Sequence, residues 1–389
     1  MAWSAGQYQR GLRGRNITQV SGNAILITLS LDFQTDVDVG SAFSGVCGTT
    51  RLIPFENGRA VVFGWGTYSG NYQAGPHQYW LAEVGREGAS HRLLPVEMTH
   101  RTEGLMAPAA DSYVQAFKLG EKFGLLLSTE RVLLFAGIHD DPVTIPIANH
   151  FSVLGEPAHR LHRHDSYFTP VHCGNAAGDC VPVVLSDPKG WGRHGRHVCL
   201  LEIDQAAGSA RWLHTQPDGS PRTTVLEEYL PLHSDVAGLA PGDARIDRDG
   251  RFVHDLPPLI YDCAWIDRHW YLYLAGYQDN YSRFGIPLGV LTRNFIDLTL
   301  LEPVFKPQEQ SFGHICASLE RMIVSPLRAN GAHKGKQTIF VFGDGEEHML
   351  TLPRGYSKFQ VEEYFAGHYW LTPAAMGHNR MPLTIVACT

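Results

Sequence analysis

Short apolar or alternating runs recur along the whole chain, and they predict β-strands. Each run is bounded by Gly, Pro, Asn or Asp, as at 49–66, where TTRLIPFENGRAVVFGWG reads as a strand, a tight turn and a second strand. Helical periodicity is almost absent. The pattern therefore predicts an all-β protein.

The predicted strands group into repeats of strand, tight turn, strand, long loop, strand, tight turn and strand. Five repeats are complete, whereas the sixth, from Lys358, supplies only three strands. Four-stranded units of this kind are the blades of a β-propeller. The expected blades cover approximately 49–96, 113–147, 168–216, 259–305, 312–353 and 358–389, with long insertions at 148–167 and 217–257.

An apolar segment before the first repeat has no partner of its own. AILITLSLDF, residues 24–33, would supply the outer strand that the sixth repeat lacks, as a closing strand over 23–33 after an N-terminal extension at 1–22. Such a strand closes a circular array and protects its edges. The sequence thus predicts a single domain with a six-bladed β-propeller fold. Five or seven blades, or a two-sheet sandwich, are the alternatives.

The connections between predicted strands differ in length at the two ends of each repeat. With the strands of a blade named a to d from the channel outwards, the a–b and c–d turns are short, and the b–c and d–a connections hold the long insertions. Rigid scaffolds carry recognition on long loops. The b–c and d–a side is therefore expected to be the working surface.

Two of the b–c loops share a pattern of Tyr, a two-residue gap and Asn-Tyr, in GTYSGNYQAGP at 66–76 and GYQDNYSRFGIP at 276–287. Tyr, Trp and Arg are the residue types enriched at binding hot spots, and Tyr and Trp also stack on sugar rings. These loops therefore predict a contact surface. Its candidate residues are Tyr68, Asn71, Tyr72, Trp191, Arg193, Tyr277, Asn280, Tyr281, Arg283 and Arg380.

Polar residues on the predicted innermost strands are candidates for a second kind of site. Imidazole and carboxylate groups that converge from several blades hold a metal or act as acid and base, although polar lining is also what a watery channel needs. A one-residue slip reverses every side chain of a strand, so the sequence leaves the inward-facing set open. The candidates are Gln115, His172, Asp262, His314 and Glu362.

A cluster of histidines precedes and enters the third repeat, in HRLHRHDSYFTPVHC. Neutral imidazoles and a carboxylate are good ligands for zinc or a similar ion, but the spacing matches no zinc motif. Two fragments resembling calcium loops, at 36–40 and 247–250, lack the Glu that position 12 requires. The candidate metal ligands are His159, His162, His164 and His172, with Asp165 beside them.

Composition and charge narrow the function classes. The 389 residues are 44% hydrophobic and 18% charged, as in a folded protein, and a net charge of −7 without a run of Lys or Arg argues against nucleic-acid binding. No apolar run reaches the roughly 18 residues of a membrane span. Seven scattered cysteines without a CxxC pair indicate reduced thiols, and no signal-peptide pattern opens the chain. We expect a soluble protein of the cytoplasm, or of a particle assembled there.

No motif specifies an enzyme class or a propeller family. The WD dipeptide, the kelch double glycine and the Asp-box are missing, as are GxSxG, P-loop and HExxH patterns. The prediction is a non-enzymatic binding or assembly module that presents its long loops to a protein partner, within a larger complex or a viral particle. Two alternatives stay open: a metal-assisted hydrolase of carbohydrate or ester substrates at the channel, and a glycan-binding lectin. No cofactor is predicted, apart from a divalent metal in the hydrolase alternative.

Overall fold

The structure is a computed structural model, and the chain divides into two compact units. The first unit contains residues 31–223 and 375–387, and the second contains residues 1–30, 224–374 and 388–389. The structure describes residues 25–28, 31–43, 47–67, 77–95, 98, 114–127, 129–149, 169–186, 195–213, 224–225, 259–266, 269–276, 286–294, 298–300, 310–317, 322–329, 338–343, 346–351, 359–373 and 383–389.

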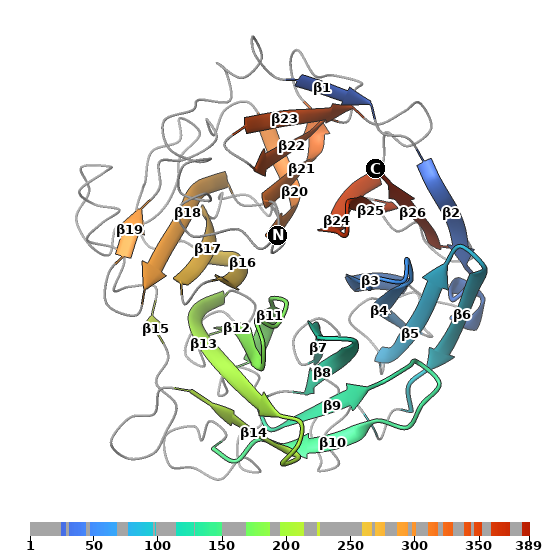
Figure 1. The fold of residues 1–389 in the computed structure, drawn as a ribbon, viewed down its shortest axis with the longest axis vertical. Coiled ribbons are helices and arrows are strands. Elements are labelled where there is room, and N and C mark those ends of the chain that lie inside the picture. The colour runs from blue at the N-terminus through green and yellow to red at the C-terminus, as the bar shows by residue number, and fades with distance from the viewer. Residues whose placement is uncertain are drawn as a thin grey trace. The chain divides into compact units, whose positions relative to one another are not determined.

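Three four-stranded antiparallel meanders, labelled in Figure 1, form the first unit's sheets. In each, consecutive strands are hydrogen-bonded neighbours. The first sheet consists of β3 (Cys47–Pro54), β4 (Ala60–Thr67), β5 (His77–Gly85) and β6 (Gly88–Leu93). The second consists of β7 (Val114–Leu119), β8 (Lys122–Leu127), β9 (Arg131–Phe135) and β10 (Val143–Pro146), and the third of β11 (Thr169–Cys173), β12 (Cys180–Ser186), β13 (Gly195–Asp204) and β14 (Ser209–Trp212).

The second unit repeats the meander, after the two-residue strand β15 (Thr224–Val225). The fourth sheet consists of β16 (Leu259–Ile266), β17 (His269–Gly276), β18 (Ile286–Asn294) and β19 (Leu298–Leu300). The fifth consists of β20 (Gln310–Ala317), β21 (Met322–Ala329), β22 (Thr338–Gly343) and β23 (Glu346–Thr351). The hairpin of β24 (Phe359–Phe365) and β25 (His368–Pro373) follows.

The last sheet has the order β2-β26-β25-β24, so an N-terminal strand completes it. β2 (Leu31–Val37) lies beside β26 (Leu383–Cys388), and Thr384 Oγ1 donates a hydrogen bond of 2.7 Å to Asp36 Oδ1 between them. The predicted fold class is thereby confirmed: the protein is an all-β propeller of four-stranded antiparallel blades, with an N-terminal strand in the last one. The number of blades stays a prediction.

The completing strand starts later in the chain than the predicted 23–33. Residues 24–33 contribute to two strands, because β1 (Ile25–Thr28) pairs in parallel with β23 and adds a fifth strand to that sheet. Only β2 joins β26. After β2, the 3₁₀ turn η1 (Gly40–Ala42) leads to Phe43, which is buried against Gly66.

Apolar side chains of the second sheet are buried on both of its faces. Phe123, Leu125 and Phe135 share one cluster with the first sheet, whereas Phe117 and Leu126 share another with the third. The alternation of the two sets has the period of two that a β-strand imposes. Sheets stacked face to face in this way leave little freedom at the core, and they form a rigid base for the connections at their ends.

The strand bounds reproduce the predicted difference between connections. The a–b and c–d turns are short, as at 86–87, 120–121 and 366–367. The b–c and d–a connections include 68–76, 94–113, 147–168 and 277–285. The second sheet departs from this pattern, because its b–c connection, 128–130, is shorter than its c–d connection, 136–142. In the described part of the chain, no helix is long and apolar enough to cross a membrane.

Candidate functional site

A β-bulge recurs in the innermost strand of the propeller sheets. In five a–b hairpins the pairing register shifts by one residue, which leaves one extra residue on strand a. The pairing of β7 with β8 is regular. Bulges bend a strand and re-aim the side chain that follows, and they are common beside functional sites. The shifts lie at Thr49/Arg51, Pro170/His172, Ile260/Asp262, Phe312/His314 and Val361/Glu363, with a further shift at Ser311/Phe312.

The residue directly after each of these five shifts is polar. Its distance from the a–b turn differs: four further ladder pairs follow Asp262↔Tyr273, whereas two follow Glu363↔Trp370. The residues that follow the shifts are Arg51, His172, Asp262, His314 and Glu363. Three of them were predicted as channel candidates from the sequence.

In the first unit the burial pattern shows which face carries these residues. Arg51 pairs with Phe63, which belongs to the cluster shared with the second sheet. Gln115 pairs with Leu126 on the face turned to the third sheet, and Gln115 is 7% exposed. His172 lies on the face opposite to its neighbour Cys173, which packs toward the second sheet. β3 and β7 thus carry a polar residue on the face turned to the next sheet, and β11 carries His172 on the face turned away from the second sheet.

Arg51 links the first sheet to the third through its side chain. Its Nη2 donates a hydrogen bond of 3.0 Å to Oδ1 of Asn175, which lies just after β11. Close by, the backbone N–H of Ala176 donates to the carbonyl of Lys118 on β7 at 3.0 Å. The inner ends of the three sheets are therefore joined by polar contacts. Neither Arg51 nor Asn175 was predicted from the sequence. Arg51 is marked only by the bulge in the structure.

Cys173 and Cys199 lie in the apolar cluster between the second and third sheets. Burial raises the pKa of both thiols far above the ordinary value, while the charge of Arg51 opposes this for Cys173 and a backbone hydrogen bond at Leu200 opposes it for Cys199. A thiol that stays protonated is neither a nucleophile nor a metal ligand at neutral pH. These cysteines are structural.

Two adjacent glutamates mark the inner strand of the last sheet. Glu362, the predicted candidate, is the extra residue of the bulge, and its Oε1 accepts a hydrogen bond of 2.6 Å from Oγ1 of the buried Thr372. Glu363 is the residue directly after the bulge, as His172 is in β11, and it is only 2% exposed. Its Oε1 accepts from the backbone N–H of Tyr364 at 3.2 Å.

Most of the other predicted site residues lie outside the described residues. This applies to Tyr68, Asn71, Tyr72, Trp191, Arg193, Tyr277, Asn280, Tyr281, Arg283 and Arg380, and to His159, His162, His164 and Asp165. Asp262 and His314 are described by their backbone, on β16 and β20. Within the described part of the chain, no three His, Cys, Asp or Glu side chains gather in a way that could hold a metal ion.

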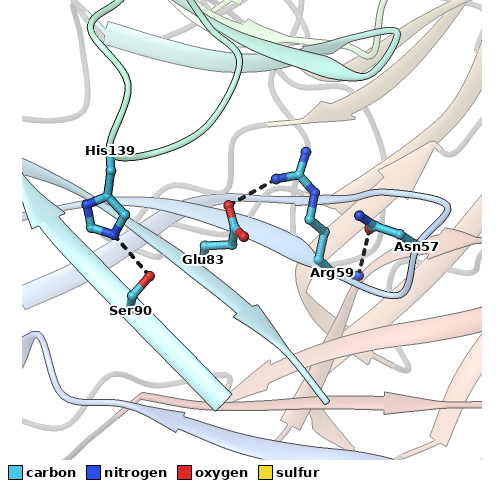
Figure 2. Close-up of polar contacts among 5 residues, drawn as sticks. All are labelled: Asn57, Arg59, Glu83, Ser90 and His139. Atoms are coloured by element: carbon cyan, nitrogen blue, oxygen red, sulfur yellow. Dashed lines mark hydrogen bonds and ion pairs between the residues drawn. The ribbon is translucent and has the colours of Figure 1, made fainter. Parts of the chain in front are cut away.

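At the short-turn end, polar contacts brace the first two sheets, as Figure 2 shows. Arg59 Nη1 and Glu83 Oε2 form an ion pair at 3.0 Å, and Arg59 also lies 4.6 Å from the centre of the Phe55 ring. His139 Nε2 lies 3.2 Å from Ser90 Oγ, which ties the β9–β10 turn to β6. These polar side chains have their partners within the protein. The contacts therefore stabilise the fold at this end of the first two sheets.

Comparison with known proteins gives likeness of structure without likeness of sequence. No protein-family model matches the chain, and no curated protein is similar to it in sequence. The chain is similar to a sialidase of Trypanosoma rangeli in complex with sialic acid, with a TM-score of 0.46, 8% identity, and coverage of 92% of this chain and 59% of that one. It is similar to an α-L-arabinanase of Penicillium chrysogenum complexed with arabinobiose, with a TM-score of 0.41, 9% identity, and coverage of 93% and 98%. It is also similar to BamB of Moraxella catarrhalis, with a TM-score of 0.36, 10% identity, and coverage of 93% and 99%.

Proposed function

We propose that this protein is a non-enzymatic binding or assembly module, which contacts a protein partner through its long b–c and d–a connections. One observation carries the proposal: the strand bounds place most of the short turns at one end of the sheets and most of the long connections at the other, with the second sheet as the exception. Connections as long as 94–113 and 147–168 are far longer than strand pairing requires. Long loops held by a rigid scaffold are the usual carriers of recognition.

The residue types in these connections support a protein partner. Two connections, 68–76 and 277–285, each supply two tyrosines, and the second also supplies Arg283. Tyr and Arg account for a large share of binding energy at protein interfaces, since they bury large areas and still donate hydrogen bonds. The short-turn end of the first two sheets differs, because Arg59 pairs with Glu83 there, and Ser90 pairs with His139.

The test compares matched variants at the two ends of the sheets. The full chain is purified from its native source with its partners, and the mass of the complex is measured by light scattering. Tyr72→Ala with Arg283→Ala is expected to weaken the complex by up to about a thousandfold, since each hot-spot truncation costs roughly 2 kcal/mol. Arg86→Ala with Lys122→Ala, at the short turns, is the control and should leave affinity unchanged.

Cross-linking of the same complex locates the contact independently of any variant. Cross-links to the partner are expected at residues of 68–76, 94–113 and 277–285. A complex cross-linked through the short turns instead, or a monomeric chain from the native source at every salt concentration tried, would contradict the proposal.

A further inference from the structure

We propose that the outer edge of β23 is a binding site for an extended apolar segment of a partner protein, and that β1 occupies this site within the chain. The proposal concerns strand addition to the fifth sheet and does not depend on the long connections. Its basis is the pairing of β1 with β23, in which an apolar segment from the N-terminal part of the chain lies beside residues 348–351.

β1 is an addition to a sheet that is complete without it. The first, second and last sheets each consist of four strands, and β20 to β23 already make the same antiparallel meander. β1 is a fifth strand beyond β23, it has four residues, and it pairs in parallel (Figure 1). Parallel pairing is slightly less stable per residue than antiparallel pairing. Release of this short outer strand is therefore expected to cost less free energy than release of a strand inside the meander.

The orientation of β1 shows that the edge accepts a strand with no direct connection to β23. A tight turn can supply an antiparallel neighbour, whereas a parallel neighbour must arrive along a longer path. β1 arrives from the N-terminal part of the chain and pairs from Ile25↔His348 to Thr28↔Thr351. Such pairing uses backbone hydrogen bonds, which a strand of another chain supplies equally well. Recognition of extended peptides by a sheet edge has this physical basis.

The sequence of β1 indicates the chemistry of the partner segment. Its residues, ILIT, are apolar or β-branched, and these types are favoured in strands. The outer strand β10 of the second sheet differs, since it follows Pro142 and ends at Pro146. Proline has no backbone N–H and protects an edge against an added strand. β23, EEHMLT, contains no proline. The partner segment is therefore expected to be extended, at least as long as β1, and rich in Ile, Leu, Val and Thr.

β1 competes with a partner segment because it belongs to the same chain as β23. Only residues 29–30 separate β1 from β2, which is itself held in the last sheet. A short linker of this kind gives a strand an effective concentration that is roughly millimolar beside its site. The apparent affinity for a partner is reduced to the extent that β1 occupies the edge. β1 thus restricts binding to segments that pair with β23 more strongly than it does.

The test measures binding of a fluorescent peptide with the sequence of residues 23–30, NAILITLS, to two full-length proteins. One is the native chain, and the other carries Leu26→Pro with Ile27→Pro, which prevents pairing of β1 and leaves β2 unchanged. Fluorescence anisotropy is expected to show at least about tenfold tighter binding by the variant, because its edge is open. The control is the peptide with the same two prolines, which lacks a backbone donor toward β23 and should bind neither protein.

Amide hydrogen exchange locates the bound peptide and does not depend on the variant. In the native chain an excess of peptide should speed exchange over 25–28, because β1 is displaced, while 346–351 stays protected. In the variant the peptide should slow exchange over 346–351 and leave 88–93, the outer strand of the first sheet, unchanged. The proposal is overturned if the peptide binds neither protein, if the proline peptide binds equally, or if the two proteins have equal affinity. It is also overturned if exchange over 25–28 does not change, or if the peptide protects 88–93 instead.

Discussion

Asn149 joins two sheets through both ends of its side-chain amide. Its Nδ2 donates to the carbonyl of Trp212 at 3.1 Å, and its Oδ1 accepts from the backbone N–H of Trp212 at 2.8 Å. The amide thus takes the place of a residue in a strand ladder. Trp212 is fully buried, and its Nε1 donates to the carbonyl of Thr129 at 3.3 Å.

Replacement of Asn149 by Ala is expected to lower the free energy of unfolding by about 1–3 kcal/mol, because a backbone donor and acceptor near a buried indole lose their partners. Asn57→Ala is the matched control. Asn57 is exposed, and its Oδ1 accepts one hydrogen bond of 3.2 Å from the Arg59 backbone, so its loss should cost well under 1 kcal/mol. Urea denaturation measures both. Equal losses would show that Asn149 does not connect the sheets.

The buried thiols predict a pattern of reactivity and of stability against pH. Burial raises the pKa of Cys173 and Cys199 from the ordinary 9.0, so neither should react with iodoacetamide in the folded protein at pH 8, and both should react in urea. Cys180, half-buried, also has a raised pKa, from burial first and then from Glu202 and Asp179, and it should react at an intermediate rate. Peptide mass spectrometry measures the labelling.

The sign of the pH effect follows from the direction of these shifts. In the unfolded chain the thiols ionise near 9.0, whereas in the folded chain they stay protonated. Their contribution to stability is complete below pH 9 and decreases as the pH rises from there toward the raised value. Cys173→Ala should reduce this alkaline loss, as measured by urea denaturation at pH 8 and pH 10, and an unchanged loss would contradict the assignment.

Among the elements, the β7–β8 hairpin shows how closely the sheets pack. Gly124 lies opposite Phe117 in the ladder, and a Cβ at Gly124 would stand 2.3 Å from the Phe117 ring. The ring covers the strand at the point where a side chain is absent. Gly124 is therefore required by close approach rather than by backbone conformation.

Gly124→Ala is expected to destabilise the protein by about 1–3 kcal/mol, because the fully buried Phe117 ring has no free space to enter. The double variant Gly124→Ala, Phe117→Leu should lose less stability than the sum of the two single variants, since the smaller side chain makes room for the methyl group. Thermal and urea unfolding of the native chain, the two single variants and the double variant measure this double-mutant cycle. If the stability losses of the two single variants simply add in the double variant, the new methyl group does not clash with Phe117.

The strands were predictable from the sequence because their apolar residues alternate or run together between turn residues, as in β4 and β8. The break within residues 24–33 was not, since no Gly or Pro marks the end of β1, and only pairing with two different sheets separates β1 from β2. The bulges were not predictable either. A slip of one residue reverses a strand's faces, so Glu362 was favoured over Glu363, and Arg51 was missed.

At the scale of the whole molecule, the N-terminal segment contributes two strands of unequal importance. β1 adds an outer, parallel strand to a sheet that already has four antiparallel strands. β2 supplies the fourth strand of the last sheet, and the buried Val37 lies at its end. Loss of β2 would expose the edge of β26, whose side chains are almost all buried.

Removal of residues 1–30 is expected to leave a folded protein, whereas removal of residues 1–37 should cost at least about 3 kcal/mol more, because an edge of unpaired backbone groups and apolar side chains meets water. Thermal unfolding and size-exclusion chromatography compare the two truncated chains. Equal stability of the two would show that β2 is dispensable. Aggregation of the shorter chain alone is the result that an exposed β26 edge predicts.

The shared bulge also bears on how the chain arose. A single inserted codon is one event in a gene, and one extra residue stands on the inner strand of five hairpins that differ in sequence. If the hairpins arose by duplication, one insertion in an ancestral hairpin would account for the five bulges, and the regular β7–β8 hairpin would have lost it. Backbone irregularities would then record common descent where the side chains do not.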